Sequence, residues 1–218
     1  MSPLGALEAR GGNLVAVEAA PEHSVRLLTA VARAWEVMKA EAAREGVGLV
    51  AVSGFRDLER QRAIWNRKFA AALEDGLDEA AALARVLEYS APPGWSRHHW
   101  GTDLDLVGEA LAAEPRLEEA DWDDGGPCAE AGRWLARRAA DFGFVRPYDR
   151  DRGGFRPEPW HWSFGPIARP ALATALGFEW TEWLRAEPFA GSALLLRDLA
   201  RERDRFLLGI DPRLIPDQ

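Results

Sequence analysis

The sequence predicts an α+β fold that ends in a helical extension. Apolar residues recur at three- and four-residue steps over several long stretches, which is the period of an amphipathic helix. Between these stretches lie short apolar or alternating runs that are typical of strands. Past Pro166 and Pro170 the pattern predicts two or three helices, at about 171–176, 179–186 and 192–208.

The first long helix is predicted over about 25–45. Its apolar positions are Val25, Leu28, Ala32, Trp35 and Met38. Ser24 is a candidate N-cap, because its hydroxyl can accept a hydrogen bond from a free N–H of the first turn. Gly46 and Gly48 are expected to end the helix, and the apolar residues 49–52 predict a short buried strand.

A second helix is predicted over about 58–73, with Asp57 as its cap, and a third over about 78–87. The apolar stripe of the second helix consists of Leu58, Trp65, Phe69 and Ala72. Gln61 lies on the same face, one turn before Trp65, where a buried amide needs hydrogen-bond partners. Residues 91–94 then form a loop rich in proline and glycine.

Residues 102–107 alternate, so Asp103 and Asp105 share one face of a predicted strand and leucines occupy the other. Gly101 disfavours a helix through this segment and lets the chain turn tightly before the strand. The remaining expected elements are an acidic loop at 109–126, a helix at 127–142 and strands at 144–145 and 160–164.

The composition is that of an ordinary globular protein, with 47% hydrophobic and 28% charged residues among 218. The net charge of −8 makes nucleic acid and anionic membrane surfaces poor partners. No apolar run approaches the roughly 20 residues of a membrane span. The first residues lack a basic start followed by an apolar core, so we predict no export signal and expect a cytoplasmic location. Cys128 is the single cysteine, which excludes an internal disulfide and a thiolate-rich metal site.

Two segments carry most of the candidate chemistry, Ser96–Asp105 and Pro157–Trp162. The first holds two of the four histidines, and the second holds Glu158 and His161. Imidazoles, a carboxylate and a spare glutamate are the groups of a catalytic zinc site, which has one position open for water and a base to act on it. Glu158 and His161 would face opposite sides of a regular strand, so a turn near Pro159 must bring both to the metal.

Spacing leaves two choices open. Asp103 rivals Asp105 as the carboxylate ligand. It could instead orient a ligand histidine by accepting a hydrogen bond from the ring nitrogen that does not bind the metal. Adjacent residues rarely aim at one point, so only one of His98 and His99 is expected to bind the metal. His23 stands alone before a helix and is expected at the surface.

Arg56 is a further candidate. It follows the predicted strand and a glycine, where its guanidinium is well placed to bind a substrate carboxylate in bidentate fashion. The alternative is a surface arginine that pairs with Glu59 or Glu88. Gln61 on the apolar helix face favours the functional interpretation.

Four ordered segments resemble the zinc D-Ala-D-Ala carboxypeptidases and dipeptidases of bacterial cell-wall metabolism, the VanY-like group. They are SGFRD, SRHHWGTDLDL, FGFVRPYD and PEPWHW, and the resemblance covers about residues 25–166. It implies a small α+β domain with a central antiparallel sheet flanked by helices. We therefore expect a zinc metallopeptidase domain at 1–166, with its core at about 25–166, and a C-terminal helical extension at 167–218 packed on it.

The resemblance also assigns the metal site. It implies that His98, Asp105 and His161 are the ligands of Zn²⁺. It implies that Glu158 is the general base that takes a proton from the zinc-bound water.

The substrate pocket follows in the same way. The resemblance places Arg56 on the substrate carboxylate or carbonyl, and Gln61 and Ser96 in the pocket. His99 and Asp103 fall at variable positions of the family, and Asp103 stands where members usually have a small residue.

The implied activity is hydrolysis of a peptide bond near the D-Ala end of peptidoglycan stem peptides, of the D,D-carboxypeptidase type. One alternative is an L,D- or L-Ala-D-Glu peptidase, as in lysins of the same fold. Another is a non-hydrolytic, zinc-dependent module that binds wall peptides, which Glu158 argues against because a binding module needs no base. Members that act on the wall are normally exported, which conflicts with the absence of a predicted export signal. The oligomeric state cannot be predicted from the sequence.

Overall fold

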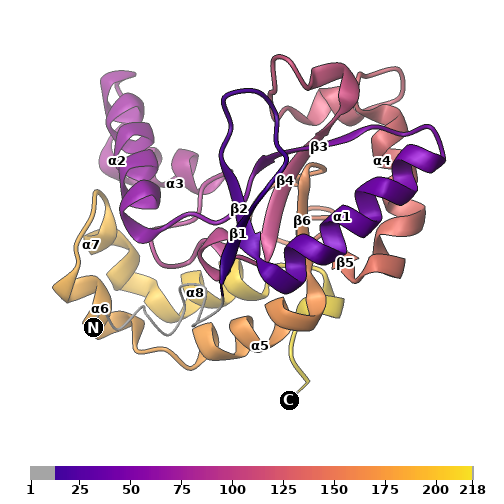
Figure 1. Cartoon of the computed structure of the whole chain (residues 1–218). Helices are drawn as coiled ribbons and strands as arrows, with labels where there is room; N and C mark the ends of the chain where they lie inside the picture. The colour runs from indigo at the N-terminus through magenta and orange to yellow at the C-terminus, as the bar shows by residue number, and fades with distance from the viewer. Residues whose placement is uncertain (1–12, 218) are drawn as a thin grey trace.

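The computed structural model describes residues 13–217. Its centre is a four-stranded antiparallel sheet with the strand order β3-β4-β6-β5 (Figure 1). The strands are β3 (Leu49–Ser53), β4 (Asp103–Gly108), β5 (Phe144–Val145) and β6 (His161–Phe164). The predicted α+β class and the central antiparallel sheet are therefore confirmed.

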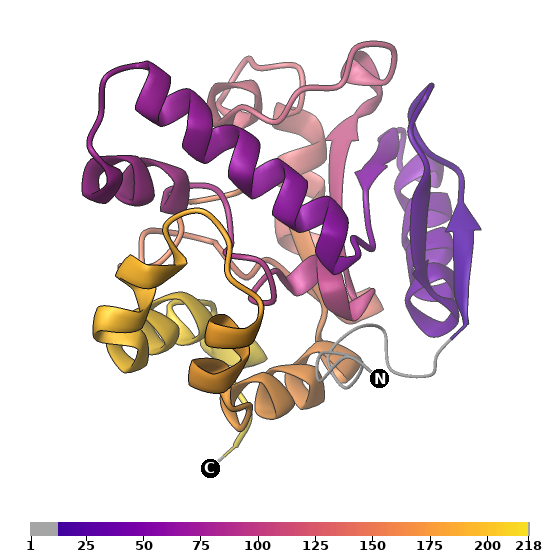
Figure 2. The same ribbon diagram turned by 90° about the vertical axis from the view of Figure 1, so that its left-hand side faces the viewer.

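Two groups of helices flank this sheet, and they lie to its right and left in Figure 1. Those on the right are α1 (Thr29–Arg44) and α4 (Ala129–Arg138), and those on the left are α2 (Leu58–Glu74) and α3 (Glu79–Leu87). The C-terminal helices run beneath α2 and the sheet (Figure 2). They are α5 (Gly165–Leu176), α6 (Trp180–Ala186), α7 (Ser192–Leu195) and α8 (Leu199–Leu208).

The two faces of β4 differ in the side chains that they carry. Leu104 and Leu106 belong to an apolar core together with buried residues of α1 and α4. Asp103 and Asp105 are also buried, on the face that the alternation assigns to them. One face of the central sheet thus builds the core, and the other is free to carry a polar site.

The predicted start of the first helix is wrong, because residues Val25–Leu28 form strand β2. They pair in antiparallel register with β1 (Leu14–Val17) to make a separate two-stranded sheet. Val25 and Leu27 are buried while Arg26 is exposed, which is strand alternation. The candidate cap Ser24 lies before this strand, and α1 begins only after it, without a side-chain cap.

Other boundaries also shift. The second helix begins at Leu58 as predicted, and the Asp57 carboxylate accepts the backbone N–H of Arg60 at 2.8 Å. The first C-terminal helix begins at Gly165 rather than 171, because Pro166 fits the first turn, where its missing N–H costs nothing. The last predicted helix is broken by a 3₁₀ turn between α7 and α8.

The C-terminal helices share a core with the rest of the chain. Trp65 and Phe69 of α2 pack in the same buried cluster as Leu172, Trp180 and Phe206. Helix α5 runs directly on from β6 and crosses the boundary expected between residues 166 and 167. The division into a domain and an extension stays a prediction.

Within residues 13–217, none of the helices combines the length and the apolar character that crossing a membrane requires.

Candidate metal centre

The register of the sheet brings the polar residues of β4 and β6 together. Asp105 lies directly opposite His161, and Asp103 lies opposite Ser163. These two cross-strand pairs are two residues apart, so all four side chains share one face of the sheet. Ser53, at the end of β3, is the partner of Asp105 on the other side.

His98 reaches this face from a 3₁₀ turn, Arg97–Trp100, that precedes β4. Gly101 ends the turn in the left-handed conformation, with φ 68°, and its N–H bonds back to the His98 carbonyl. The Nδ1 of His98 is 2.8 Å from the Gly54 carbonyl oxygen, so Nδ1 carries the proton and donates it. The other nitrogen, Nε2, faces Asp105 Oδ2 at 3.3 Å.

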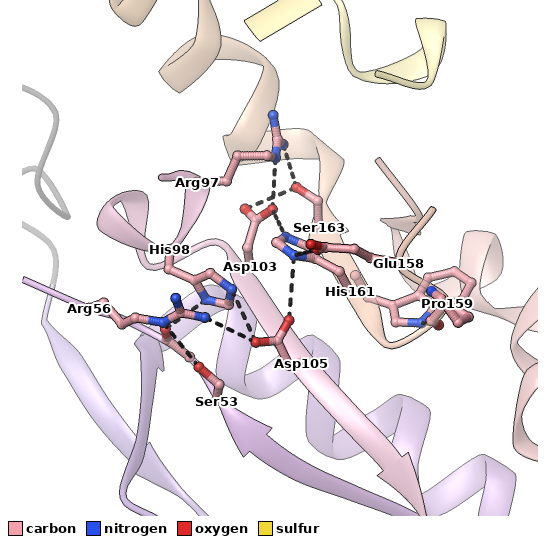
Figure 3. Close-up of polar contacts among 12 residues, drawn as sticks. Ser53, Arg56, Arg97, His98, Asp103, Asp105, Glu158, Pro159, His161 and Ser163 are labelled. Carbon is pink, nitrogen blue, oxygen red and sulfur yellow. Dashed lines mark hydrogen bonds and ion pairs between the residues drawn. The ribbon is translucent and has the colours of Figure 1, made fainter. Parts of the chain in front are cut away.

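His98, Asp105 and His161 therefore converge on one point (Figure 3). Their candidate ligand atoms all lie within 4.8 Å of one another, and the three side chains are buried. His161 Nδ1 is 3.4 Å from Asp105 Oδ1. Among the described residues this Oδ1 accepts no hydrogen bond, although it is buried. A buried carboxylate oxygen without a donor is expected where a cation completes the site.

Asp103 has a different set of partners from Asp105. Its oxygens accept hydrogen bonds from Arg97 Nε at 2.8 Å, from Ser163 Oγ at 3.0 Å and from the Thr102 hydroxyl. It is also 3.0 Å from His161 Nε2, the nitrogen that faces away from Asp105. Of the two rivals, only Asp105 lies in the cluster of three.

The second open choice is between His98 and His99, and His99 lies outside the cluster of His98, Asp105 and His161. Its Nδ1 is 2.7 Å from the Arg56 carbonyl, and its Nε2 accepts the N–H of Gly94 at 3.1 Å. Both ring nitrogens are thus used by the backbone. His23 is exposed, as expected.

Glu158 lies beside His161, and its place depends on a turn. The N–H of His161 bonds to the Glu158 carbonyl across Pro159 and Trp160, which is the turn expected near Pro159. The carboxylate Oε2 is 3.0 Å from His161 Nδ1, on the same side as Asp105. Glu158 is only 8% exposed, so it is not a solvated loop acid.

The charges of the site are strongly coupled. Burial raises the pKa of Glu158. Burial opposes the ionisation of Asp105 as well, but the attraction of His98, His161 and Arg56 holds its pKa well below the usual range. For His161 the hydrogen bonds to Asp103 and Glu158 outweigh burial and raise its pKa to about 10. Of the two histidines in the cluster, His161 is the one whose surroundings favour the protonated form, because burial lowers the pKa of His98.

Arg56 and Gln61 border the same site from the start of α2. Arg56 donates to Asp105 Oδ2 at 3.1 Å, to Gln61 Oε1 at 3.3 Å and to Ser53 Oγ at 3.3 Å. The Gln61 amide, 1% exposed, donates to the Ala91 carbonyl at 2.8 Å. Arg56 is therefore not the surface arginine of the alternative interpretation.

A pocket of about 480 Å³ opens in front of these side chains. Its lining includes every residue predicted for the site, namely Arg56, Gln61, Ser96, His98, Asp105, Glu158 and His161. The structure brings all of them together, while their individual roles stay predictions.

Sequence reasoning missed several residues of this pocket. Lys68 lines it and donates to Ser90 Oγ at 2.6 Å, and its position seven residues after Gln61 on one helix face was an available signal. Tyr148 packs edge-on against the His161 ring, with ring centroids 5.1 Å apart. The contact between Arg97 and Ser163 has no local signal, because the two lie 66 positions apart.

The α+β scaffold presents two imidazoles and a carboxylate to one point, and a buried glutamate lies beside them. This is the architecture of a metallopeptidase. The sequence pattern of the VanY D-alanyl-D-alanine carboxypeptidase family matches residues 24–167, and the chain belongs to this family. It is 29% identical over 151 residues to a D-alanyl-D-alanine carboxypeptidase of Enterococcus faecalis, which covers 67% of this chain and 52% of the relative. The chain spans about half the length of the curated relatives it matches.

Three known structures resemble the fold. A VanY D,D-pentapeptidase from a VanB-type resistance cassette, in complex with Zn(II), has a TM-score of 0.56 and 24% identity over 75% of this chain and 84% of its own. VanYB in complex with D-alanine-D-alanine has a TM-score of 0.57 and 24% identity over 80% and 90%. The LdcB LD-carboxypeptidase has a TM-score of 0.56 and 26% identity over 69% and 66%.

Proposed function

We propose that this chain is a zinc-dependent carboxypeptidase that removes the terminal D-alanine of peptidoglycan stem peptides, with D,D specificity. The observation that carries the proposal is the convergence of His98, Asp105 and His161 beside Glu158 in one pocket. Membership of the D-alanyl-D-alanine carboxypeptidase family supports the substrate class. A structural neighbour that binds Zn(II) supports the metal.

The residues of the centre fit zinc. Ligand atoms about 2.0–2.2 Å from a tetrahedral zinc lie roughly 3.3–3.6 Å from one another. His98 Nε2 is 3.3 Å from Asp105 Oδ2, and His161 Nδ1 is 3.4 Å from Asp105 Oδ1, the other oxygen of the same carboxylate. One candidate ligand atom from each of the three residues lies within 4.8 Å of the others, so the set would have to contract slightly around a zinc ion. Zinc bound by these three side chains would lower the pKa of a water in its open position and polarise a carbonyl.

Glu158 is the base in this proposal. Its carboxylate lies 3.0 Å from His161 Nδ1, the nitrogen that faces Asp105, so it is placed to accept a proton from the attacking water and pass it to the leaving amine. The raised pKa that burial produces suits a group that must first take and then return a proton.

The cations of the pocket suit a substrate that ends in a carboxylate. Arg56 presents its guanidinium beside Asp105, and Lys68 lines the same pocket. Both can attract the C-terminal carboxylate of a peptide, which would favour removal of a terminal residue over internal cleavage. Gln61 holds Arg56 in place.

The direct test is product analysis on defined stem peptides with the zinc-loaded protein. We expect release of D-alanine from a pentapeptide that ends in D-Ala-D-Ala, and no release after treatment with a chelator. Release that persists after complete removal of the metal would exclude the zinc mechanism.

Glu158→Gln separates binding from catalysis. The amide keeps the size of the side chain but cannot accept the proton, so we expect kcat to fall by about 10²–10⁴-fold. Bound zinc, measured by metal analysis, should stay at the level of the unchanged protein. Turnover at the native rate would contradict the assignment of the base.

A second candidate is an L,D-carboxypeptidase. It is favoured by the likeness to the LdcB LD-carboxypeptidase, which has the same TM-score as the zinc-bound VanY structure and slightly higher identity. This activity predicts release of D-alanine from a tetrapeptide, in which the bond follows an L-configured centre, and inactivity on the pentapeptide.

A further inference from the structure

Asp103 lies behind His161, on the side away from the candidate metal position (Figure 3). Its Oδ1 is 3.0 Å from His161 Nε2. The other ring nitrogen, Nδ1, is 3.4 Å from Asp105 Oδ1 and 3.0 Å from Glu158 Oε2. The ring therefore directs Nε2 toward Asp103 and Nδ1 toward the site.

A set of buried donors holds Asp103 in this position. Oδ1 accepts from Arg97 Nε, and Oδ2 accepts from the hydroxyls of Thr102 and Ser163. Arg97 also donates to Ser163 Oγ at 2.7 Å, which links the two donors. Its guanidinium lies 4.7 Å from the centre of the Trp100 ring.

These contacts make Asp103 a fixed acceptor. Asp103 is fully buried and Arg97 is 3% exposed, so the carboxylate has a buried counter-charge. Because both its oxygens are engaged, it is not free to rotate toward the metal position.

We propose that Asp103, held by Arg97, is a positioning residue that keeps the proton of His161 on Nε2 and directs the Nδ1 lone pair toward the metal. This inference rests on the proposed zinc chemistry. An imidazole that binds zinc is neutral and has one N–H, and Asp103 can only accept, so a bond from Nε2 to Asp103 leaves the Nδ1 lone pair for the metal. Zinc would then replace the present contact of Nδ1 with Glu158 Oε2.

The same reasoning gives His98 the opposite arrangement. Its Nδ1–H donates to the Gly54 carbonyl, which leaves Nε2 toward Asp105. The two histidines would thus bind zinc through different nitrogens. His161 has a charged acceptor behind it, which makes the imidazole a more basic ligand than one bonded to a neutral carbonyl.

The first experiment needs no substitution. Nitrogen-15 NMR of the zinc-loaded protein, with labelled histidine, should find the proton of His161 on Nε2 and that of His98 on Nδ1. A proton on Nδ1 of His161 would overturn the inference.

The second experiment measures zinc affinity by competition with a chelator of known affinity. Asp103→Asn keeps the shape of the side chain without its charge, and Asp103→Ala removes the acceptor. We expect the affinity for zinc to weaken by about 10–100-fold, as is usual when a residue that hydrogen-bonds to a metal ligand is lost.

The matched control is Asp121→Asn. Asp121 is also buried and bonds to an arginine, Arg116, at 2.9 Å and 2.7 Å, but it is not among the residues that line the pocket. Its loss should leave zinc affinity unchanged. If the Asp103 variants bind zinc as tightly as the unchanged protein, the role of Asp103 is rejected and the proposed function still stands. If the unchanged protein does not bind zinc, both the role of Asp103 and the proposed function are rejected.

Discussion

His98 and His99 are adjacent and both buried, yet their rings have different partners. His98 directs one nitrogen at Asp105, whereas His99 gives both nitrogens to the backbone, bonding to the Arg56 carbonyl and the Gly94 N–H. Burial lowers the pKa of His99 to about 4, although the bond to Arg56 opposes the shift. At the scale of single residues, His99 connects the segment that contains Arg56 to the loop that contains Gly94. The lowered pKa means that its ring makes these bonds in the neutral form.

The neutral state of His99 predicts a pH dependence of stability. The unfolded chain binds a proton at this residue near pH 6.5, but the folded chain does so only near pH 4. Between these two pH values the unfolded state holds more protons at His99 than the folded state does. The contribution of His99 to the free energy of unfolding should therefore fall by up to about 3 kcal/mol as the pH falls through this window. NMR titration of the metal-free protein should show His99 still neutral at pH 5. Protonation near pH 6.5 would contradict the prediction.

At the scale of elements, the loop at 91–94 joins the site to the C-terminal helices. The Ala91 carbonyl accepts from Gln61, and the Gly94 N–H donates to His99. Gly94 has φ +91°, and a Cβ added there would lie 2.8 Å from the Trp180 ring. Close packing against α6 therefore keeps this loop beside the turn that carries His98.

Gly94→Ala tests this contact. The added methyl group must overpack against Trp180, at a cost of about 1–3 kcal/mol, in addition to roughly 1 kcal/mol for an alanine at positive φ. Gly76→Ala is the matched control, because Gly76 has φ +87° with nothing within 4 Å of an added Cβ. Urea unfolding should show a larger loss of stability for Gly94→Ala. Equal losses would show that the packing at α6 is unimportant.

At the scale of the whole molecule, residues 13–217 form three apolar clusters, two of them large. One joins the sheet to α1 and α4, and the other joins α2 to the C-terminal helices. The second core reaches the site through a row of rings. Phe206 packs on Phe155, Phe155 on Tyr148, and Tyr148 on His161. The C-terminal helices thus support a candidate metal ligand.

Phe206→Ala tests whether these helices stabilise the whole chain. Phe206 is 2% exposed, so its removal should cost about 3–5 kcal/mol. Val37→Ala is the control, because Val37 is 59% exposed and its loss should change stability by less than about 0.5 kcal/mol. We expect one cooperative urea transition, shifted as a whole. Two separate transitions, with only one of them shifted, would show that the C-terminal helices unfold independently.

Local patterns predicted much of this molecule. The helical periods of α1 and α2, the Asp57 cap, and the alternation of β4 are all properties of neighbouring residues. The candidate site was also predictable, because its residues fall in short motifs whose order resembles a known family. Zinc chemistry restricts the usable side chains so strongly that the type and spacing of residues indicate the site.

Contacts between distant segments determined the rest. Val25–Leu28 forms a strand only because Leu14–Val17 pairs with it, and nothing in its own residues excludes a helix. Arg97 finds Ser163 only because the sheet register sets Asp103 opposite Ser163. The sequence by itself, through its residue types and their resemblance to a known family, indicated the candidate metal ligands and where most of the helices and strands lie. The tertiary structure alone decided which nitrogen of each histidine faces the site, because hydrogen bonds between strands and loops orient a ring.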